Sequence, residues 1–171
     1  MRFTVRAVDL DETPRPGEDP RDYVLRLAAE KAGAQAKPGE LVLAADTVVV
    51  VGGEILGKPR DPDDAKRMLR RLSGRTHTVL TGIALEEPGR EGIAEADESE
   101  VRVAALSGEE IDWYVATEEP RDKAGAYAIQ GLGSLFVEAV EGNYSNVVGL
   151  PIPRTYRLFA RMGYDLKDFR G

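Results

Sequence analysis

The sequence contains no cysteine and only one histidine among its 171 residues. The absence of cysteine excludes disulfides and thiolate nucleophiles, and a lone histidine, His77, argues against a zinc site or a histidine-based catalytic triad. His77 lies in an alternating segment, and we interpret it as a structural or exposed residue. Any catalysis therefore has to use carboxylates, lysines and a metal ion.

Long apolar runs are absent as well. No stretch reaches the roughly 18 apolar residues of a membrane span, and the first six residues lack the apolar block of a signal peptide. We therefore expect a cytoplasmic protein with no membrane partner. A hydrophobic content of 42% over 171 residues is sufficient for one globular domain with a sizeable core, spanning residues 1–171.

Positive charge is scarce, because 23 lysines and arginines face 30 acidic residues, giving a net charge of −7. Such a chain repels nucleic-acid polymers and anionic membrane surfaces. A small polyanion can bind only where lysines, arginines, backbone N–H groups or a divalent cation offset this field. The sequence thus excludes a nucleic-acid polymer as partner, and it leaves a homodimer open.

Patterns typical of strands and of helices alternate along the chain, which indicates a single α/β domain with a mixed, twisted sheet flanked by helices. Turn residues and helix-capping signals set the expected boundaries. The predicted elements are a strand at 3–8, a helix beginning at Asp19-Pro20, two strands over 41–57 joined at Gly52-Gly53, a helix from Asp61-Pro62 to Ser73-Gly74, strands on either side of an acidic connection at 86–98, a helix with a Ser107/Glu110 capping box, a strand at 134–140, and a last helix over 152–163.

Asp46 is the most unusual residue, because it interrupts an apolar run in "LVLAADTVVVV". An isolated buried carboxylate costs several kcal/mol unless a cation or hydrogen-bond donors lie nearby. Asp46 is either a strand-end residue that bonds a turn, or a metal ligand or general base. With a two-residue turn, Val51 pairs with Glu54 and Thr47 lies opposite Lys58, which leaves Asp46 on the other face. A bulge, bend or strand end is therefore needed to bring Asp46 and Lys58 into one cleft.

Lys31 and Glu12 are weaker candidates from the sequence alone. Lys31 continues the apolar stripe of the first helix, where a lysine commonly extends its head to water. Its role in binding phosphate depends on other phosphate-binding residues lying close to it. Glu12 follows the first predicted strand in an acidic loop, where it can ligate magnesium or simply be solvated.

Two later loops combine glycine with polar side chains. The segment 121–133, "RDKAGAYAIQGLG", offers Asp122, Lys123 and Gln130 on a flexible backbone suited to lining a phosphate or base pocket, although turn chemistry alone also explains it. The segment 141–151 offers Asn143, Ser145 and Asn146, for which capping or turn formation is the alternative. The arginines and lysine between residues 66 and 71 are interpreted as a solvated helix face.

Six motifs occur in the order "DLDET", "EKA", "AADTVVVVGGEILGKP", "LSGRTHTVLTG", "DKAGAYAIQGLG" and "GNYSNVVGLP". Together they resemble the Maf-like nucleotide pyrophosphatase family, also called septum formation inhibitor proteins, from about residue 3 to about residue 160. The resemblance implies hydrolysis of a nucleoside triphosphate to the monophosphate and pyrophosphate, with Mg²⁺ or Mn²⁺ as cofactor. The "GKP" and "AIQG" forms look like the branch that acts on dTTP and UTP.

The resemblance also implies roles for individual residues. Asp46 looks like the catalytic base, and Glu12 and Asp46 look like the metal ligands. Lys31 and Lys58 are expected to line the same triphosphate pocket. The substrate-binding residues would be Thr47 and Gln130, which match positions that set base specificity, together with Asp122, Lys123 and Asn146.

Family members normally begin with an apolar strand and a Ser-x-Ser-Pro-Arg-Arg loop followed by a helix. This sequence contains no such segment, so we expect the family's fold without its first strand and helix, from either an upstream start or a truncated member. One alternative is a non-catalytic nucleotide-binding or interaction module. Another is a haloacid-dehalogenase-type phosphatase in which Asp9 of "DLDET" is the nucleophile and Asp11 the acid/base, although the later Gly-Asp-rich metal motif of that fold is not found.

Overall fold

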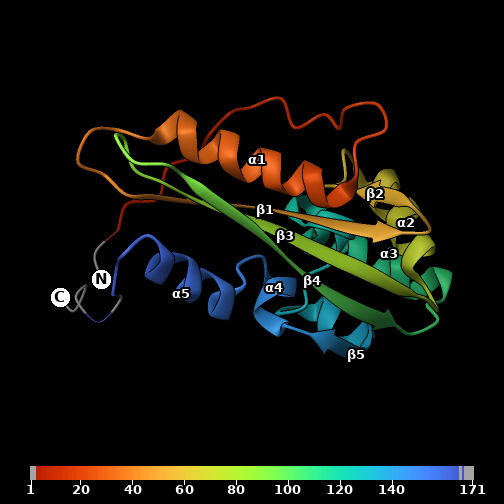
Figure 1. The fold of residues 1–171 in the computed structure, drawn as a ribbon. Coiled ribbons are helices and arrows are strands. Elements are labelled where there is room, and N and C mark those ends of the chain that lie inside the picture. The colour runs from red at the N-terminus through yellow and green to blue at the C-terminus, as the bar shows by residue number, and fades with distance from the viewer. Residues whose placement is uncertain (1–2, 166, 168–171) are drawn as a thin grey trace.

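A computed structural model describes residues 3–165 and 167 and has an α/β architecture built on one five-stranded sheet (Figure 1). The predicted fold class is confirmed. In chain order the elements are α1 (Pro20–Gln35), β1 (Val42–Val51), β2 (Glu54–Leu56), α2 (Pro62–Leu72), β3 (Thr76–Glu86), β4 (Ile93–Val103), α3 (Gly108–Ala116), the 3₁₀ helices η1 (Glu119–Asp122), η2 (Ala124–Ala126) and η3 (Leu132–Phe136), β5 (Val137–Gly142), α4 (Tyr144–Val148) and α5 (Ile152–Arg161).

The strand order is β2-β1-β3-β4-β5, and all four pairings are antiparallel. The prediction of a mixed sheet is therefore wrong, because the described strands pair only in the antiparallel direction. The reason lies in the short strand β2, which turns the chain back along β1. Helix α2 then returns the chain to the end of the sheet where β2 began, so β3 enters opposite to β1. Strands β3 and β4 form the long hairpin that the sequence suggested.

The β1–β2 hairpin has the predicted register, with Val51 opposite Glu54 across Gly52-Gly53. Both glycines have positive φ angles, 56° and 79°, as a tight two-residue turn requires. Strand β2 pairs only with Val49–Val51 and ends at Leu56. In the described chain, the first seven residues of β1 consequently pair with β3 alone. The end of β2 at Leu56 is the strand end that was needed to bring Asp46 and Lys58 into one cleft.

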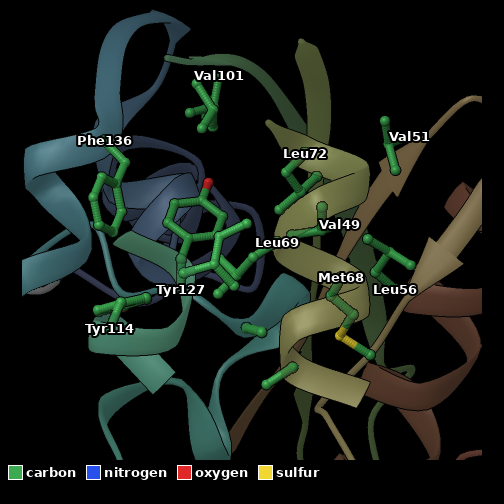
Figure 2. Packing of buried hydrophobic residues seen from close by; sticks show 14 of the residues in the cluster. Val49, Val51, Leu56, Met68, Leu69, Leu72, Val101, Tyr114, Tyr127 and Phe136 are labelled. Atoms are coloured by element: carbon green, nitrogen blue, oxygen red, sulfur yellow. The ribbon is translucent and has the colours of Figure 1, made fainter. Parts of the chain in front are cut away.

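Side chains of the sheet alternate between two apolar layers. Val48 and Leu80 face α1, where they pack with Leu27. Val49 and Val79 face the opposite side, which α2, α3 and α5 cover (Figure 1). Figure 2 shows the larger of these clusters, in which residues from β1, β2, α2, β4, α3 and the segment between η2 and β5 pack together: Val49, Val51, Leu56, Met68, Leu69, Leu72, Val101, Tyr114, Tyr127 and Phe136.

Local capping signals place the helices where the sequence predicts them. The Asp19 side chain accepts a hydrogen bond from the Arg21 N–H at 2.8 Å, and Asp61 accepts one from the Asp64 N–H at the same distance. Ser107 and Glu110 form both hydrogen bonds of a capping box. These caps fix the starts of α1, α2 and α3.

One predicted strand is absent and another is shifted along the chain. Residues 3–8 do not form a strand, and Phe3 and Val5 are 75% and 83% exposed. In the part of the chain described, no strand lies beside this segment, so its backbone N–H and C=O groups cannot form the hydrogen bonds of a sheet. The strand expected over 134–140 begins only at Val137, after η3, and the short α4 was not predicted. Within residues 3–165, no helix is both long and apolar enough to cross a membrane.

Candidate active site

Asp46 projects from β1 toward α1 and is 9% exposed. Its neighbour on α1 is Lys31, whose Nζ donates to Asp46 Oδ1 at 2.6 Å. The two residues meet because the even-numbered positions of β1 face α1, while Lys31 lies one helical turn beyond Leu27 on the helix face that packs on the sheet. The cation that the sequence required beside Asp46 is therefore Lys31.

Glu12 approaches the same lysine from the loop before α1. Its Oε1 lies 2.6 Å from Lys31 Nζ, so one ammonium group bridges two carboxylates. Tyr23, the fourth residue of α1, holds the loop in place, since its hydroxyl donates to the backbone carbonyl of Glu12 at 2.7 Å. Sequence reasoning missed Tyr23, and its only signal was a phenol at the start of an apolar stripe, where a polar tip needs a partner.

The electrostatics of this cluster favour a carboxylate that binds protons more readily than usual. Burial raises the pKa of Asp46, and the hydrogen bond from Lys31 offsets this only in part. Burial would lower the pKa of Lys31, but hydrogen bonds to Asp46 and Glu12 outweigh it and raise the pKa. Lys31 is therefore charged at neutral pH. Among the described residues, Asp46 Oδ2 has no hydrogen-bond donor and stays available.

The cluster forms one side of a cavity of about 280 Å³ at the unpaired edge of β1. The charged residues of the lining are three acids and three lysines, which makes the cavity formally neutral in a chain of net charge −7. The three lysines thus supply the local positive charge that an acidic protein needs in order to bind a polyanion. These six residues are Glu12, Lys31, Asp46, Lys58, Asp122 and Lys123.

Lys58 and Lys123 enter the cavity from two loops that are tied together. Lys58 follows the end of β2, is exposed, and has no ion-pair partner within the described part of the chain, whereas Lys123 pairs with Asp122 at 2.6 Å. The Gly125 N–H donates to the Gly57 carbonyl at 3.0 Å. Gly125 has a φ of 69°, and a Cβ there would lie 2.8 Å from the Val49 side chain, so only glycine fits.

Thr47 lines the cavity from the opposite face of β1. Its Oγ1 lies 2.9 Å from Thr81 Oγ1, and Thr81 donates to the backbone carbonyl of Asn146 at 3.0 Å. Thr81, which sequence reasoning missed, lies directly opposite Thr47 on β3. No tight turn connects β1 to β3, so counting from a turn could not have given this register. The apolar part of the lining includes Val148 and four residues of the cluster on this face of the sheet, Val79, Tyr127, Ile129 and Val147.

Two predicted substrate-binding residues lie outside the cavity lining. Asn146 is fully buried, and its Nδ2 donates to the Val79 carbonyl at 2.9 Å and to Ser99 Oγ at 3.0 Å. It thereby fixes the segment that follows it, whose residues 147–149 do line the cavity. Gln130 is exposed on the loop before η3. Asn143 has the capping function considered as its alternative, since it accepts from the Ser145 N–H at 3.0 Å.

The residues of the phosphatase alternative are separate from this site. Asp9 and Asp11 are exposed in a segment without strand structure, and neither lines the cavity. The Asp11 carboxylate accepts from the Thr13 N–H, and the hydrogen bonds from Thr13 lower its pKa. His77 is buried against the Tyr127 hydroxyl at 2.9 Å, and burial lowers its pKa to about 4. His77 is therefore neutral and structural.

The chain is similar to known proteins over most of its length. The family model described as "Maf-like protein" matches residues 1–162. A protein of Anaeromyxobacter dehalogenans (strain 2CP-1) named dTTP/UTP pyrophosphatase is 58% identical over 169 residues, covering 97% of this chain and 86% of the relative. Proteins of the same name from Myxococcus xanthus and Symbiobacterium thermophilum are 54% and 49% identical, covering 97% and 96% of this chain and 85% of each relative.

Proposed function

Because this chain belongs to the Maf-like protein family, we propose that it is a nucleoside triphosphate pyrophosphatase that hydrolyses dTTP and UTP to the monophosphate and pyrophosphate. One observation carries the proposal. The Glu12 and Asp46 carboxylates meet at the Lys31 ammonium in a cavity that two further lysines enter. The proposed unit is a single domain spanning residues 1–171.

The lysines provide the binding energy for the phosphate chain. Lys58 has no competing carboxylate partner among the described residues, so phosphate oxygens can bind it without breaking an ion pair. Lys123 pairs with Asp122 on the surface, where exchange of one anion for another costs little. Lys31 is already held between two carboxylates, and it can donate a third hydrogen bond to a phosphate oxygen.

The acidic residues fit a divalent cation that is shared with the substrate. Glu12 and Asp46 oxygens converge on one small cation, here the Lys31 ammonium, at 2.6 Å each. Residues 3–165 contain no group of three or more metal-binding side chains, so a closed protein cage is absent. Mg²⁺ typically uses one or two carboxylates, water and substrate phosphates. When bound through Glu12 and Asp46, such an ion would neutralise charge on the phosphate chain.

Asp46 supplies the general base. Its Oδ1 is held by Lys31, while Oδ2 can accept a proton from water. The water oxygen bonds to one phosphorus of the α–β anhydride, and the bridging oxygen leaves with the other phosphate group. The water proton passes to Asp46, and the lysines stabilise the charge on the leaving group.

The test is the product analysis of wild-type protein with MgCl₂ or MnCl₂ and each nucleoside triphosphate. Pyrophosphate and the monophosphate should form from dTTP and UTP, and chelation of the metal should stop the reaction. The β,γ-methylene analogue of dTTP should be cleaved and the α,β-methylene analogue should not, because only the latter lacks the anhydride oxygen between the α and β phosphates. Hydrolysis in ¹⁸O-labelled water then shows which phosphorus is attacked.

The alternatives give different products. Binding of dTTP without turnover would identify a non-catalytic nucleotide-binding module, and release of inorganic phosphate from monoesters would identify a phosphatase. The substrate-binding roles of Gln130, Asp122 and Asn146 remain predictions, as do a cytoplasmic location and a homodimer.

A further inference from the structure

The hydroxyl groups of Thr47 and Thr81 form a directed chain. A backbone carbonyl can only accept a hydrogen bond, so Thr81 must use its single hydroxyl proton on the Asn146 carbonyl, 3.0 Å away. The contact of 2.9 Å between Thr81 Oγ1 and Thr47 Oγ1 then needs the proton of Thr47. Both protons point away from the cavity. Thr47 therefore presents only lone pairs to a ligand.

The surroundings of Thr47 suit a nucleobase rather than phosphate. All charged residues of the lining lie in the lysine-containing loops or on the α1 side of β1, at Asp46 and its partners. Thr47 faces the other side, where the lining is apolar and includes the Tyr127 ring. A cavity with a charged half and an apolar half fits a nucleotide in one orientation, with its base beside Thr47.

We propose that Thr81 is a positioning residue for base specificity, because it fixes the Thr47 hydroxyl as an acceptor that selects bases with a ring N–H. Uracil and thymine carry a proton on N3 and can donate to Thr47. Cytosine has an unprotonated N3, which would face the Thr47 lone pairs without a hydrogen bond. A buried site built to accept a hydrogen bond discriminates against a ligand that cannot donate one. This inference rests on the proposed function and deepens it.

The experiment compares dTTP with N3-methyl-dTTP and dCTP in wild-type protein and in Thr81→Val. The wild type should prefer dTTP over both by at least about tenfold in kcat/KM, since one hydrogen bond is at stake. In Thr81→Val the Thr47 proton is released and can turn toward the cavity, so Thr47 can donate to N3 of cytosine. The preference for dTTP over dCTP should then fall by about tenfold, while N3-methyl-dTTP remains poor. Thr81→Ser should restore the wild-type ratio.

Ser99→Ala is the matched control, because it removes a buried hydroxyl of the same network without touching the Thr47–Thr81 contact. Ser99 bonds Asn146 Nδ2 and the backbone of Asn143. This variant should lose stability and keep the base preference. Equal losses for dTTP and dCTP in Thr81→Val, or an altered base preference in Ser99→Ala, would overturn the inference and assign Thr81 a structural role.

Calorimetry with α,β-methylene analogues separates the inference from the proposed function. The affinity ratio between the thymidine and deoxycytidine analogues should show the same preference and the same loss in Thr81→Val, even in a protein that does not turn over. A wild-type protein that binds both analogues equally would contradict the inference while leaving pyrophosphate release intact. A wild-type protein that selects thymidine but releases no pyrophosphate would contradict only the proposed function.

Discussion

Asp46 and Asp64 are both buried, with 9% and 6% of their surface exposed, but their pKa values shift in opposite directions. Burial would raise the pKa of Asp64, yet hydrogen bonds from the Arg60 backbone and side chain and from Arg67 lower it to about 2. Asp46 receives a hydrogen bond from Lys31 alone, and burial raises its pKa. Each carboxylate accepts a hydrogen bond from a cationic side chain, so the presence of a cation does not by itself explain the difference.

The difference lies in how fully the carboxylate oxygens are satisfied. Both oxygens of Asp64 accept hydrogen bonds, and its role is to connect the segment before α2 with the helix. Asp46 has one oxygen without a donor among the described residues, and the residue lines a cavity. A buried carboxylate with spare hydrogen-bonding capacity costs stability and is poised to bind a proton or a metal. Burial alone therefore does not distinguish a functional aspartate from a structural one.

The largest expected difference between Asp46 and Asp64 appears when the charge of each is removed in turn. Asp46→Asn should lower kcat for dTTP by about 10²- to 10⁴-fold, because the proposed general base is lost. The free energy of unfolding at pH 7 should not decrease, since the ionised Asp46 is costly to bury and Lys31 keeps its contact with Glu12. Pyrophosphate release and urea unfolding measure the two effects.

Asp64→Asn is the matched control and should show the reverse pattern. Its kcat should stay within a few-fold of the wild type, while the free energy of unfolding decreases by about 1–3 kcal/mol through the loss of charged hydrogen bonds. If both variants lost activity and stability alike, the distinction between the two carboxylates would be wrong.

A second prediction concerns the ammonium group that lies where a cation would bind. Lys31→Met should lower the hydrolysis of dTTP by about a hundredfold, because a phosphate contact is lost. Without nucleotide, the same variant should bind Mn²⁺ at least about tenfold more tightly than the wild type, since no ammonium competes for Glu12 and Asp46. Electron paramagnetic resonance of free Mn²⁺ measures this affinity directly.

Lys66→Met is the control for the loss of one positive charge, since Lys66 of α2 pairs with Asp112 of α3 and neither residue lines the cavity. It should change neither turnover nor Mn²⁺ binding. Unchanged or weaker Mn²⁺ binding in Lys31→Met would mean that Glu12 and Asp46 do not share a cation, and the proposed metal position would fail.

The pH dependence of activity should also distinguish Asp46 from Asp64. Because Asp46 must be ionised to act as the proposed base and its pKa is raised above the ordinary 3.8, kcat/KM should fall tenfold per pH unit on an acid limb centred above pH 3.8. Asp64→Asn should leave this limb unchanged, since Asp64 titrates near 2. An acid limb centred at or below pH 3.8 would contradict the raised pKa.

The sequence predicted those parts of the fold that short-range interactions determine. Asp19-Pro20 gave the start of α1, and Gly52-Gly53 gave the β1–β2 register together with the need for a strand end near Asp46. Residues 3–8 show the limit, since an alternating pattern forms a strand only where another strand pairs with it. Pairing across the sheet is not encoded within the segment itself.

The candidate site likewise combines residues with a local sequence signal and residues whose role depends on distant parts of the chain. Asp46 could be proposed because it interrupts an apolar run, whereas Lys31 only continued an apolar stripe and was assigned to the phosphate pocket through the resemblance to the family. The position of Asn146 could not, because its role depends on the Val79 carbonyl and the Ser99 hydroxyl, which come from two other strands. Thr81 gave no sequence signal either, since its partners lie 34 and 65 residues away.

The smallest expected effect is on the free energy of unfolding at acidic pH, where the contribution of Asp64 can be measured separately. A carboxylate whose pKa is lowered in the folded state stabilises the protein above its unfolded pKa of about 3.8, and this contribution is lost as the pH falls through about 2. The difference in unfolding free energy between wild type and Asp64→Asn should therefore be constant from pH 7 to about pH 5 and should shrink between about pH 4 and pH 2.

For Asp46 the change in unfolding free energy with falling pH should have the opposite sign. Its raised pKa makes the folded state bind a proton more readily, so wild type should gain stability relative to Asp46→Asn as the carboxylate is protonated. Urea unfolding of the three proteins at intervals from pH 7 to pH 2 tests both slopes, and parallel curves for the two variants would show that their carboxylates have equivalent environments.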